Sequence, residues 1–194
     1  AAQLRDYLEA HPATSLADAA WTLATHRSRF PARAAVLGRD LAQVGAALQA
    51  LAAGRADEQV VQGSALTQRG VVFVFPGQGS QWPGMAVRLY RELPVFAQAI
   101  DACDEAFAPH TDFSLRQVLL AEEAEQLQAF TRVDVVQPAL FAMAVALARV
   151  WESLGIRPTA VVGHSQGELA AAYVAGALRL EDAARAVAVR SRLL

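Results

Sequence analysis

The segment Gly163-His164-Ser165-Gln166-Gly167 constrains the fold of this chain more than any other feature. It follows an apolar run at residues 159–162 that is typical of a buried strand, and residues 168–175 after it have the pattern of a helix. Two glycines let the backbone turn so tightly that the serine projects from the end of the strand. The segment therefore predicts a strand–turn–helix unit of an α/β fold.

A second unbroken apolar run, residues 71–75, predicts a strand buried on both faces of a parallel sheet. Pro76-Gly77-Gln78-Gly79 then predicts a sharp turn. Both glycine-rich turns follow the carboxyl ends of strands, where open α/β sheets bind ligands, so we expect the two loops to share one site. By itself Gly-Gln-Gly also fits an ordinary turn, and it lacks the Lys-Ser/Thr ending of a nucleotide P-loop.

The chain is expected to contain two domains, residues 1–66 and 67–194, because residues 63–70 form a polar connector with Gly and Ser. The first reads as a small α/β unit, with a helix at its start, a helix at 15–25 capped by Ser15, a strand at 32–37, a helix at 41–53 and a short strand at 59–62. In the second, helices are expected over much of 85–107, over 138–154 and from Glu181 or Asp182 to the end.

Ser165 is the candidate nucleophile, because its hydroxyl would lie at the N-terminus of a helix, where developing negative charge is favoured. The backbone N–H of Gln166 is the natural donor to an oxyanion formed there. The alternative is that the glycines only make a tight turn and that Ser165 only caps the helix. His164 is interpreted as a positioning residue, since successive residues on such a turn point in different directions.

Composition and charge exclude several other classes of protein. A hydrophobic content of 54% suits a globular core, and a net charge of -2 with scattered basic residues gives no footprint for nucleic acid. The four histidines and Cys103 lack metal-ligand spacing, so no metal is expected, and Cys103 reads as a small buried side chain. We find neither a signal peptide nor the roughly 20 apolar residues of a membrane span, and we expect a cytoplasmic protein.

Four segments in order carry a resemblance to a known family: residues 75–85, 132–138, 163–168 and the tail through Arg190. Together they resemble the acyltransferase domain of type I modular polyketide synthases, which is related to malonyl-CoA:acyl carrier protein transacylases. Residues 1–66 resemble the linker between the ketosynthase and acyltransferase domains. The resemblance implies an α/β-hydrolase-like, mostly parallel-sheet acyltransferase domain after a small α/β linker domain.

The resemblance also implies roles for individual residues. Ser165 would carry the acyl group, and the backbone N–H groups of Gln78 and Gln166 would form the oxyanion hole. Arg190 would bind the free carboxylate of a malonyl-type extender unit, as guanidinium groups bind carboxylates. From the residues alone, Arg190 is better explained as a solvated helix residue. The implied partners are an acyl-CoA, an acyl carrier protein with its phosphopantetheine, and a neighbouring ketosynthase, with no cofactor bound by this chain.

The segment Arg132-Val133-Asp134-Val135-Val136-Gln137 resembles the signature of acyltransferases that use methylmalonyl-CoA, and Gln166 after the serine agrees with it. The alternative is that these residues only lead into the helix expected at Pro138 and pack it. In the family, the catalytic histidine lies well downstream of the serine. Because His11, His26 and His110 lie in no suitable loop, we expect this chain to be an incomplete acyltransferase that lacks its base.

Two other functions remain open. A serine hydrolase of the same fold type would pass the acyl group to water, although Arg190 argues against an esterase. A non-catalytic scaffold would use residues 1–66 only to dock onto a ketosynthase.

Overall fold

The computed structural model describes residues 1–65 and 70–194, which divide into two compact units. The domain boundary predicted between residues 66 and 67 lies outside the described residues. The first unit contains α1 (Ala2–Ala10), α2 (Leu16–Thr25), β1 (Ala32–Val36), α3 (Leu41–Ala52) and β2 (Val60–Ser64). The second contains β3 (Val71–Phe75), α4 (Val87–Glu92), α5 (Pro94–Phe107), η1 (Ala108–His110), α6 (Leu115–Leu120), α7 (Glu123–Ala129), α8 (Val133–Ser153), β4 (Pro158–Gly163), α9 (Gly167–Val174) and α10 (Leu180–Arg192).

The first unit is a small α/β unit, as the sequence predicts. Its strands β1 and β2 pair antiparallel, and α1 packs on α3. The Oγ of Ser15 accepts the Asp18 N–H at 3.4 Å, which confirms the predicted cap of α2. Strand β2 continues through Gly63 and Ser64, so the start of the expected connector belongs to the sheet.

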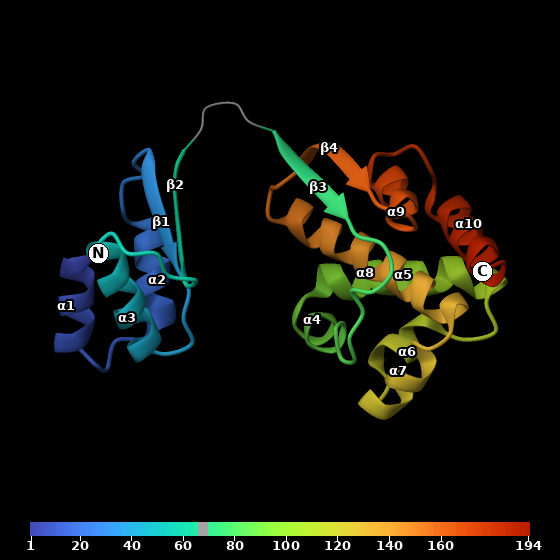
Figure 1. Ribbon diagram of the computed structural model, residues 1–194, viewed down its shortest axis with the longest axis horizontal. Helices are drawn as coiled ribbons and strands as arrows, with labels where there is room; N and C mark the ends of the chain where they lie inside the picture. The colour runs from blue at the N-terminus through green and yellow to red at the C-terminus, as the bar shows by residue number, and fades with distance from the viewer. Residues whose placement is uncertain (66–69) are drawn as a thin grey trace. The chain divides into compact units, whose positions relative to one another are not determined.

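In the second unit β3 and β4 pair in parallel, with Phe73 opposite Val161 and Phe75 opposite Gly163 (Figure 1). Their carboxyl ends therefore meet at one edge, as expected for the two glycine-rich loops. Helix α9 leaves this edge and packs back on both strands. The class is α/β, with a parallel sheet, as predicted.

The expectation that β3 is buried on both faces is wrong for the described residues. Phe75 is buried and Phe73 packs on the core, but Val72 and Val74 are 49% and 68% exposed. Alternate side chains of a strand point to opposite faces, so one face of the sheet packs on the core and the other is uncovered. An unbroken apolar run does not reveal which of its faces a neighbour covers.

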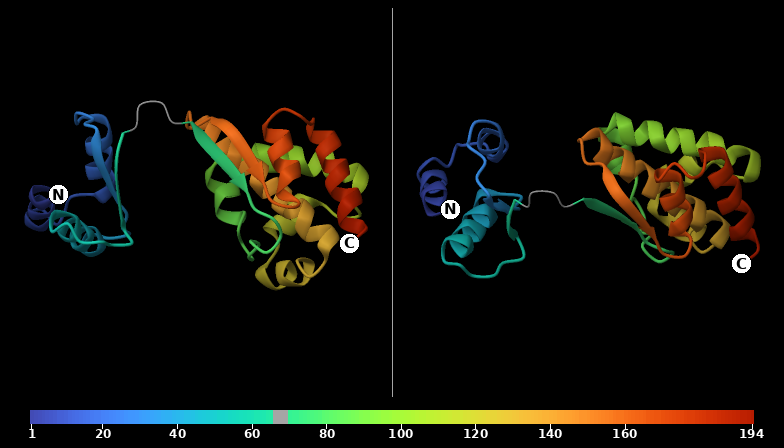
Figure 2. Two further views of the ribbon diagram at one scale, coloured as in Figure 1. Left: turned by 45° about the horizontal axis from the view of Figure 1, so that its top comes forward. Right: turned by 90° about the horizontal axis from the view of Figure 1, so that it is seen from above.

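Helix α8 is the central element of the core and packs against α5 and α10 (Figures 1 and 2). It begins at Val133, earlier than the predicted start at Pro138, because Val135 and Val136 already contribute buried side chains to its core face. Pro138 thus lies inside the helix and cannot donate to the Asp134 carbonyl. The sequence marks Pro138 as a start only because proline is common in a first helical turn.

By length and composition α8 also resembles a membrane span, contrary to the expectation that no stretch reaches that limit. However, 67% of its apolar window is buried inside the unit. It is therefore the buried core helix of this domain.

Gly167 is predicted to be essential to the packing of α9 on β3. A Cβ added there would lie 2.6 Å from the Pro76 carbonyl oxygen and closer still to that of Phe75, and neither backbone group can move freely. Gly167→Ala should therefore lower the free energy of unfolding by about 1–3 kcal/mol, the usual cost of overpacking. Urea denaturation followed by circular dichroism measures this change.

Gly45→Ala is the matched control, because a Cβ at this position in α3 meets no atom within 4 Å. That substitution should be neutral or stabilise by about 0.5–1 kcal/mol, since alanine favours a helix interior. Equal denaturation midpoints for Gly167→Ala and the unchanged protein would contradict the proposed close packing.

Candidate active site

Ser165 lies in the tight turn between β4 and α9 with a left-handed backbone, φ +54°. Among the described residues it is the one non-glycine residue with a positive φ. Such a conformation is strained for a residue with a Cβ, and it persists only where the surroundings enforce it. Ser165 is exposed, so its hydroxyl is available to a ligand.

Close backbone packing on both sides enforces this turn. A Cβ on Gly163 would fall 2.7 Å from the Gly167 carbonyl carbon and closer to the backbone of Glu168. The Gly167 N–H donates to the His164 carbonyl at 2.9 Å, which closes the turn. The glycines therefore have the steric role that the sequence predicts for them.

The turn is joined to the first glycine-rich loop. The His164 N–H donates to the Phe75 carbonyl at 3.0 Å, and a Cβ on Gly77 would lie 2.9 Å from His164 Nδ1. The two loops predicted to share a site are thus side by side. His164 lies against the neighbouring loop.

The backbone N–H groups of Gln78 and Gln166 lie unoccupied at this edge of the described chain. In the described part of the chain, no hydrogen bond occupies the N–H of Gln78 or of Gln166. Gln166 is the N-cap residue of α9, where the helix dipole favours negative charge.

Arg190 in the last turn of α10 reaches the serine. Its Nη2 donates to Ser165 Oγ at 3.3 Å, although the two residues lie far apart in sequence. Arg192, on the same helix, instead donates to the His110 carbonyl. The residue pattern alone favours a solvated Arg190, and the structure places it beside the candidate nucleophile.

No histidine of the described chain is seen to hydrogen-bond to Ser165. His110 and His164 belong to the same unit as the serine, and neither ring contacts Oγ by a hydrogen bond. In the first unit, His11 stacks on Tyr7 and His26 contacts Thr25.

Cys103 is the other nucleophilic side chain to consider. It is fully buried in α5, as predicted, and burial raises the pKa of its thiol to about 12. A neutral, inaccessible thiol is a poor nucleophile, so Cys103 does not compete with Ser165.

The segment 132–137 forms the first turns of α8 and divides into three parts. Arg132 and Asp134 form a bidentate ion pair, with Nη2 to Oδ2 at 2.7 Å, and this pair lowers the pKa of the Asp134 carboxyl. Val133 is half-buried, and Val135 and Val136 pack in the interior.

Gln137 is also buried, and its Nε2 donates to Gln78 Oε1 at 3.3 Å. Gln137 is thus the residue of this segment that the structure joins to the site.

Sequence reasoning missed Gln126, which is 1% exposed and bonds to the Gly84 N–H at 2.8 Å. Its neighbours in α7 are mostly exposed, and the polar ones among them are similar to it in sequence, so no pattern distinguishes it from them. Only the folded chain shows that this side chain points inward.

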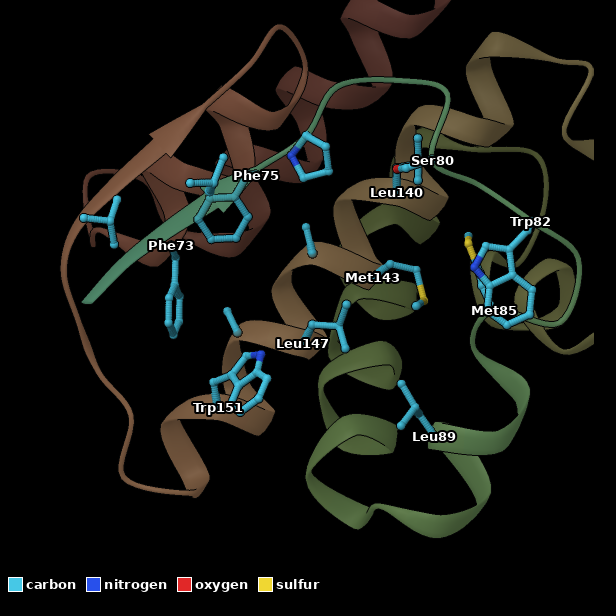
Figure 3. Close-up of a pocket in the computed structure, with 15 residues that line it drawn as sticks. Phe73, Phe75, Ser80, Trp82, Met85, Leu89, Leu140, Met143, Leu147 and Trp151 are labelled. Atoms are coloured by element: carbon cyan, nitrogen blue, oxygen red, sulfur yellow. The ribbon is translucent and has the colours of Figure 1, made fainter. Parts of the chain in front are cut away.

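An apolar groove of about 550 Å³ runs beside the first loop (Figure 3). Met143, Leu147 and Trp151 of α8 form one wall, and Trp82 and Met85 lie across from Met143. Neither Ser165 nor Arg190 is among the described residues that line it. The candidate nucleophile therefore lies outside this groove.

Two known family models match the chain, one in each of the two structural units. Residues 72–194 match a family model described as the acyl transferase domain. Residues 1–48 match a model described as CurL-like, PKS C-terminal.

Individual relatives are a polyketide synthase protein and acyltransferase domains. The spectinabilin polyketide synthase system protein NorA of Streptomyces orinoci is 53% identical over 194 residues, which cover 100% of this chain and 10% of NorA. The acyltransferase domain from module 8 of the salinomycin polyketide synthase is 46% identical with a TM-score of 0.80, covering 98% of this chain and 45% of that one. The acyl transferase domain of SpnD, solved with 2-(pent-4-yn-1-yl)malonyl, is 32% identical with a TM-score of 0.77, covering 98% and 44%.

The strained backbone of Ser165 gives a stability prediction that is independent of activity. Ser165→Gly should be more stable than Ser165→Ala by about 1 kcal/mol, because only glycine adopts a left-handed backbone without steric cost. Thermal or urea denaturation of the two variants measures the difference.

Ser153, at the end of α8, provides the reverse comparison, because its backbone is helical. There the alanine variant should be the more stable by about 0.5–1 kcal/mol. If the alanine variant is the more stable one at both positions, the turn imposes no strain on Ser165.

Proposed function

The chain belongs to the acyltransferase domains of modular polyketide synthases, and on that premise we propose that it loads an extender unit through an acyl-serine intermediate. The observation that carries the proposal is the exposed Ser165 on its strand–turn–helix turn, with Arg190 at 3.3 Å from its Oγ.

The proposed reaction has two transfers. Ser165 Oγ attacks the thioester carbonyl of an acyl-CoA, the C–S bond breaks, and the serine proton passes through a base to the departing CoA thiolate. The phosphopantetheine thiol of an acyl carrier protein then attacks the acyl-serine ester. The acyl group leaves on that thiol, and the proton returns to Ser165.

Both steps pass through a tetrahedral oxyanion, which the available N–H groups of Gln78 and Gln166 would bind. One such donor is worth about 2.7–4 kcal/mol of barrier. The placement of Gln166 at the N-terminus of α9 adds the favourable end of the helix dipole. His164 supports this arrangement by packing one loop on the other.

Arg190 would select a diacid. An acyl group of the malonyl class esterified to Oγ carries a free carboxylate near the ester, within reach of a guanidinium that already contacts Oγ. The malonyl-type ligand of the related SpnD structure supports this substrate class.

The extender unit is proposed to be methylmalonyl, because residues 132–137 resemble the signature of acyltransferases that use methylmalonyl-CoA and Gln166 agrees with that signature. Discrimination between methylmalonyl and malonyl depends on one methyl group, which an apolar pocket distinguishes by only about 1–3 kcal/mol. We therefore expect a preference and not an exclusion.

The remaining parts of the proposal concern the catalytic base and the role of residues 1–66. The chain spans a tenth of NorA and less than half of the solved acyltransferase chains. We propose that the base is a histidine elsewhere in the same protein and that residues 1–66 link the domain to a ketosynthase. The reaction is assigned to the cytoplasm, where acyl-CoA substrates are held.

The central prediction is that Ser165 is acylated and that methylmalonyl-CoA outcompetes malonyl-CoA. The protein that carries these residues is incubated with equal amounts of both thioesters, and the acylated peptide is identified by mass spectrometry. The expected product is methylmalonyl-Ser165, in excess of malonyl-Ser165 by about 10-fold or more, from the energy of one methyl group.

Ser165→Ala is the control and should abolish the label. A label that survives this substitution would contradict the nucleophile, and an excess of malonyl-Ser165 would contradict the extender unit. Release of free diacid as the main product, in the presence of the carrier protein, would favour a hydrolase.

A separate prediction tests the carboxylate contact. Arg190→Ala should slow loading of methylmalonyl and malonyl groups by about 10–100-fold, because the substitution removes a charged hydrogen bond worth about 1.5–3 kcal/mol. Loading of propionyl and acetyl groups, which have no free carboxylate, should change much less. Single-turnover acylation with each thioester measures the difference.

Arg185→Ala is the matched variant, since Arg185 is an exposed arginine of the same helix. It should leave the ratio of diacid to monoacyl loading unchanged. If Arg190→Ala slows both classes equally, Arg190 has only a structural role.

A further inference from the structure

The loop that follows β3 is held at two places by buried glutamine side chains from other helices. Gln137 of α8 bonds to Gln78 near the start of the loop, and Gln126 of α7 bonds to Gly84 near its end. The loop between them carries the Gln78 N–H that the proposed function assigns to the oxyanion hole.

Gln126 is a fully bonded buried amide. Its Oε1 accepts the Gly84 N–H at 2.8 Å, while its Nε2 donates to the carbonyls of Leu119 at 3.1 Å and Ala121 at 2.8 Å. It therefore ties the end of the loop to the last turn of α6 and to the residue that follows this helix. Gly84 itself has φ +81°, so this end of the loop has a conformation that few other residues adopt.

Gln137 is a buried amide that is only partly bonded. It is 4% exposed, and its Nε2 donates to Gln78, while its Oε1 has no hydrogen-bond partner in the described chain. Burial of an unpaired amide oxygen is costly, and leucine or methionine would fill the same space on α8 without that cost. Packing alone thus gives no reason for an amide at position 137.

We propose that Gln126 and Gln137 are positioning residues that fix the loop at residues 76–84 and so place the Gln78 N–H for oxyanion binding. The inference rests on the proposed function, because the oxyanion forms only if Ser165 attacks a carbonyl. It gives Gln137 a role in positioning, distinct from the choice of extender unit. The two glutamines act through one loop, so their effects are coupled.

The test uses Gln126→Met and Gln137→Met in the protein that carries these residues, singly and together. Methionine has nearly the same shape as glutamine but neither donates nor accepts these bonds. Each single variant should slow acylation of Ser165 by about 10–100-fold, because a misplaced donor loses contact only in the transition state. Affinity for methylmalonyl-CoA, measured in a Ser165→Ala background, should change by less than about threefold, since the ground state has no oxyanion.

The acylation rate of the double variant, compared with the rates of the two single variants, distinguishes positioning of the loop from a general loss of stability. The double variant should be slowed much less than the product of the two single effects, because the loop can be released only once. Hydrogen exchange at the Gly79 and Gly84 amides should also become faster in each single variant. Gln128→Met is the control: Gln128 is an exposed residue of the same helix as Gln126, and its substitution should alter none of these quantities.

A second substitution covers the case in which Gln126→Met fails to fold. Gln78→Met removes the bond to Gln137 from an exposed side chain, so it should fold and should slow acylation of Ser165 about as much as Gln137→Met does. Wild-type acylation rates in folded Gln126→Met and Gln137→Met would overturn the inference alone. A double variant slowed by the full product of the two single effects would also overturn the inference alone. Absence of acyl-Ser165 in the unchanged protein would instead overturn the proposed function.

Discussion

The contact on which the site depends is the approach of the first residue of α9 to the last residue of β3 and to the proline that follows it. Gly167 lies so close to the Phe75 and Pro76 carbonyls that no side chain fits between them. The same approach allows the His164 N–H to reach the Phe75 carbonyl. Because both loops are fixed to one another through backbone atoms, the strained turn at Ser165 is determined by packing and not by the preference of serine.

The buried helices determine which side chains meet at this edge. Helices α5, α8 and α10 pack together, and this packing directs Arg190 toward Ser165 while Arg192 reaches the His110 carbonyl. Helix α8 contributes Gln137 to the neighbouring loop by the same means. The candidate nucleophile and the candidate oxyanion donors therefore lie on two loops, but the helical core sets which side chains reach them.

Local features of the fold and site could be predicted from the sequence, and features set by tertiary packing could not. Glycine spacing and apolar runs locate β3, β4 and the turn at Ser165, since steric requirements act between near neighbours. The start of α8 at Val133 was missed because proline at 138 is a strong local signal that tertiary burial overrides. The exposure of Val74 and the inward direction of Gln126 depend on distant neighbours, and no local pattern encodes them.

The parallel register of β3 with β4 has a consequence for synthesis of the chain. Val71 pairs opposite Pro158, so β3 leaves the ribosome long before its partner strand exists. At about 5–20 residues per second, the apolar strand waits several seconds with its backbone groups unpaired. Non-local pairing of this kind is slow and exposes a strand to association with other chains. The nascent polypeptide thus exposes β3 to aggregation between the emergence of Phe75 and that of Gly163.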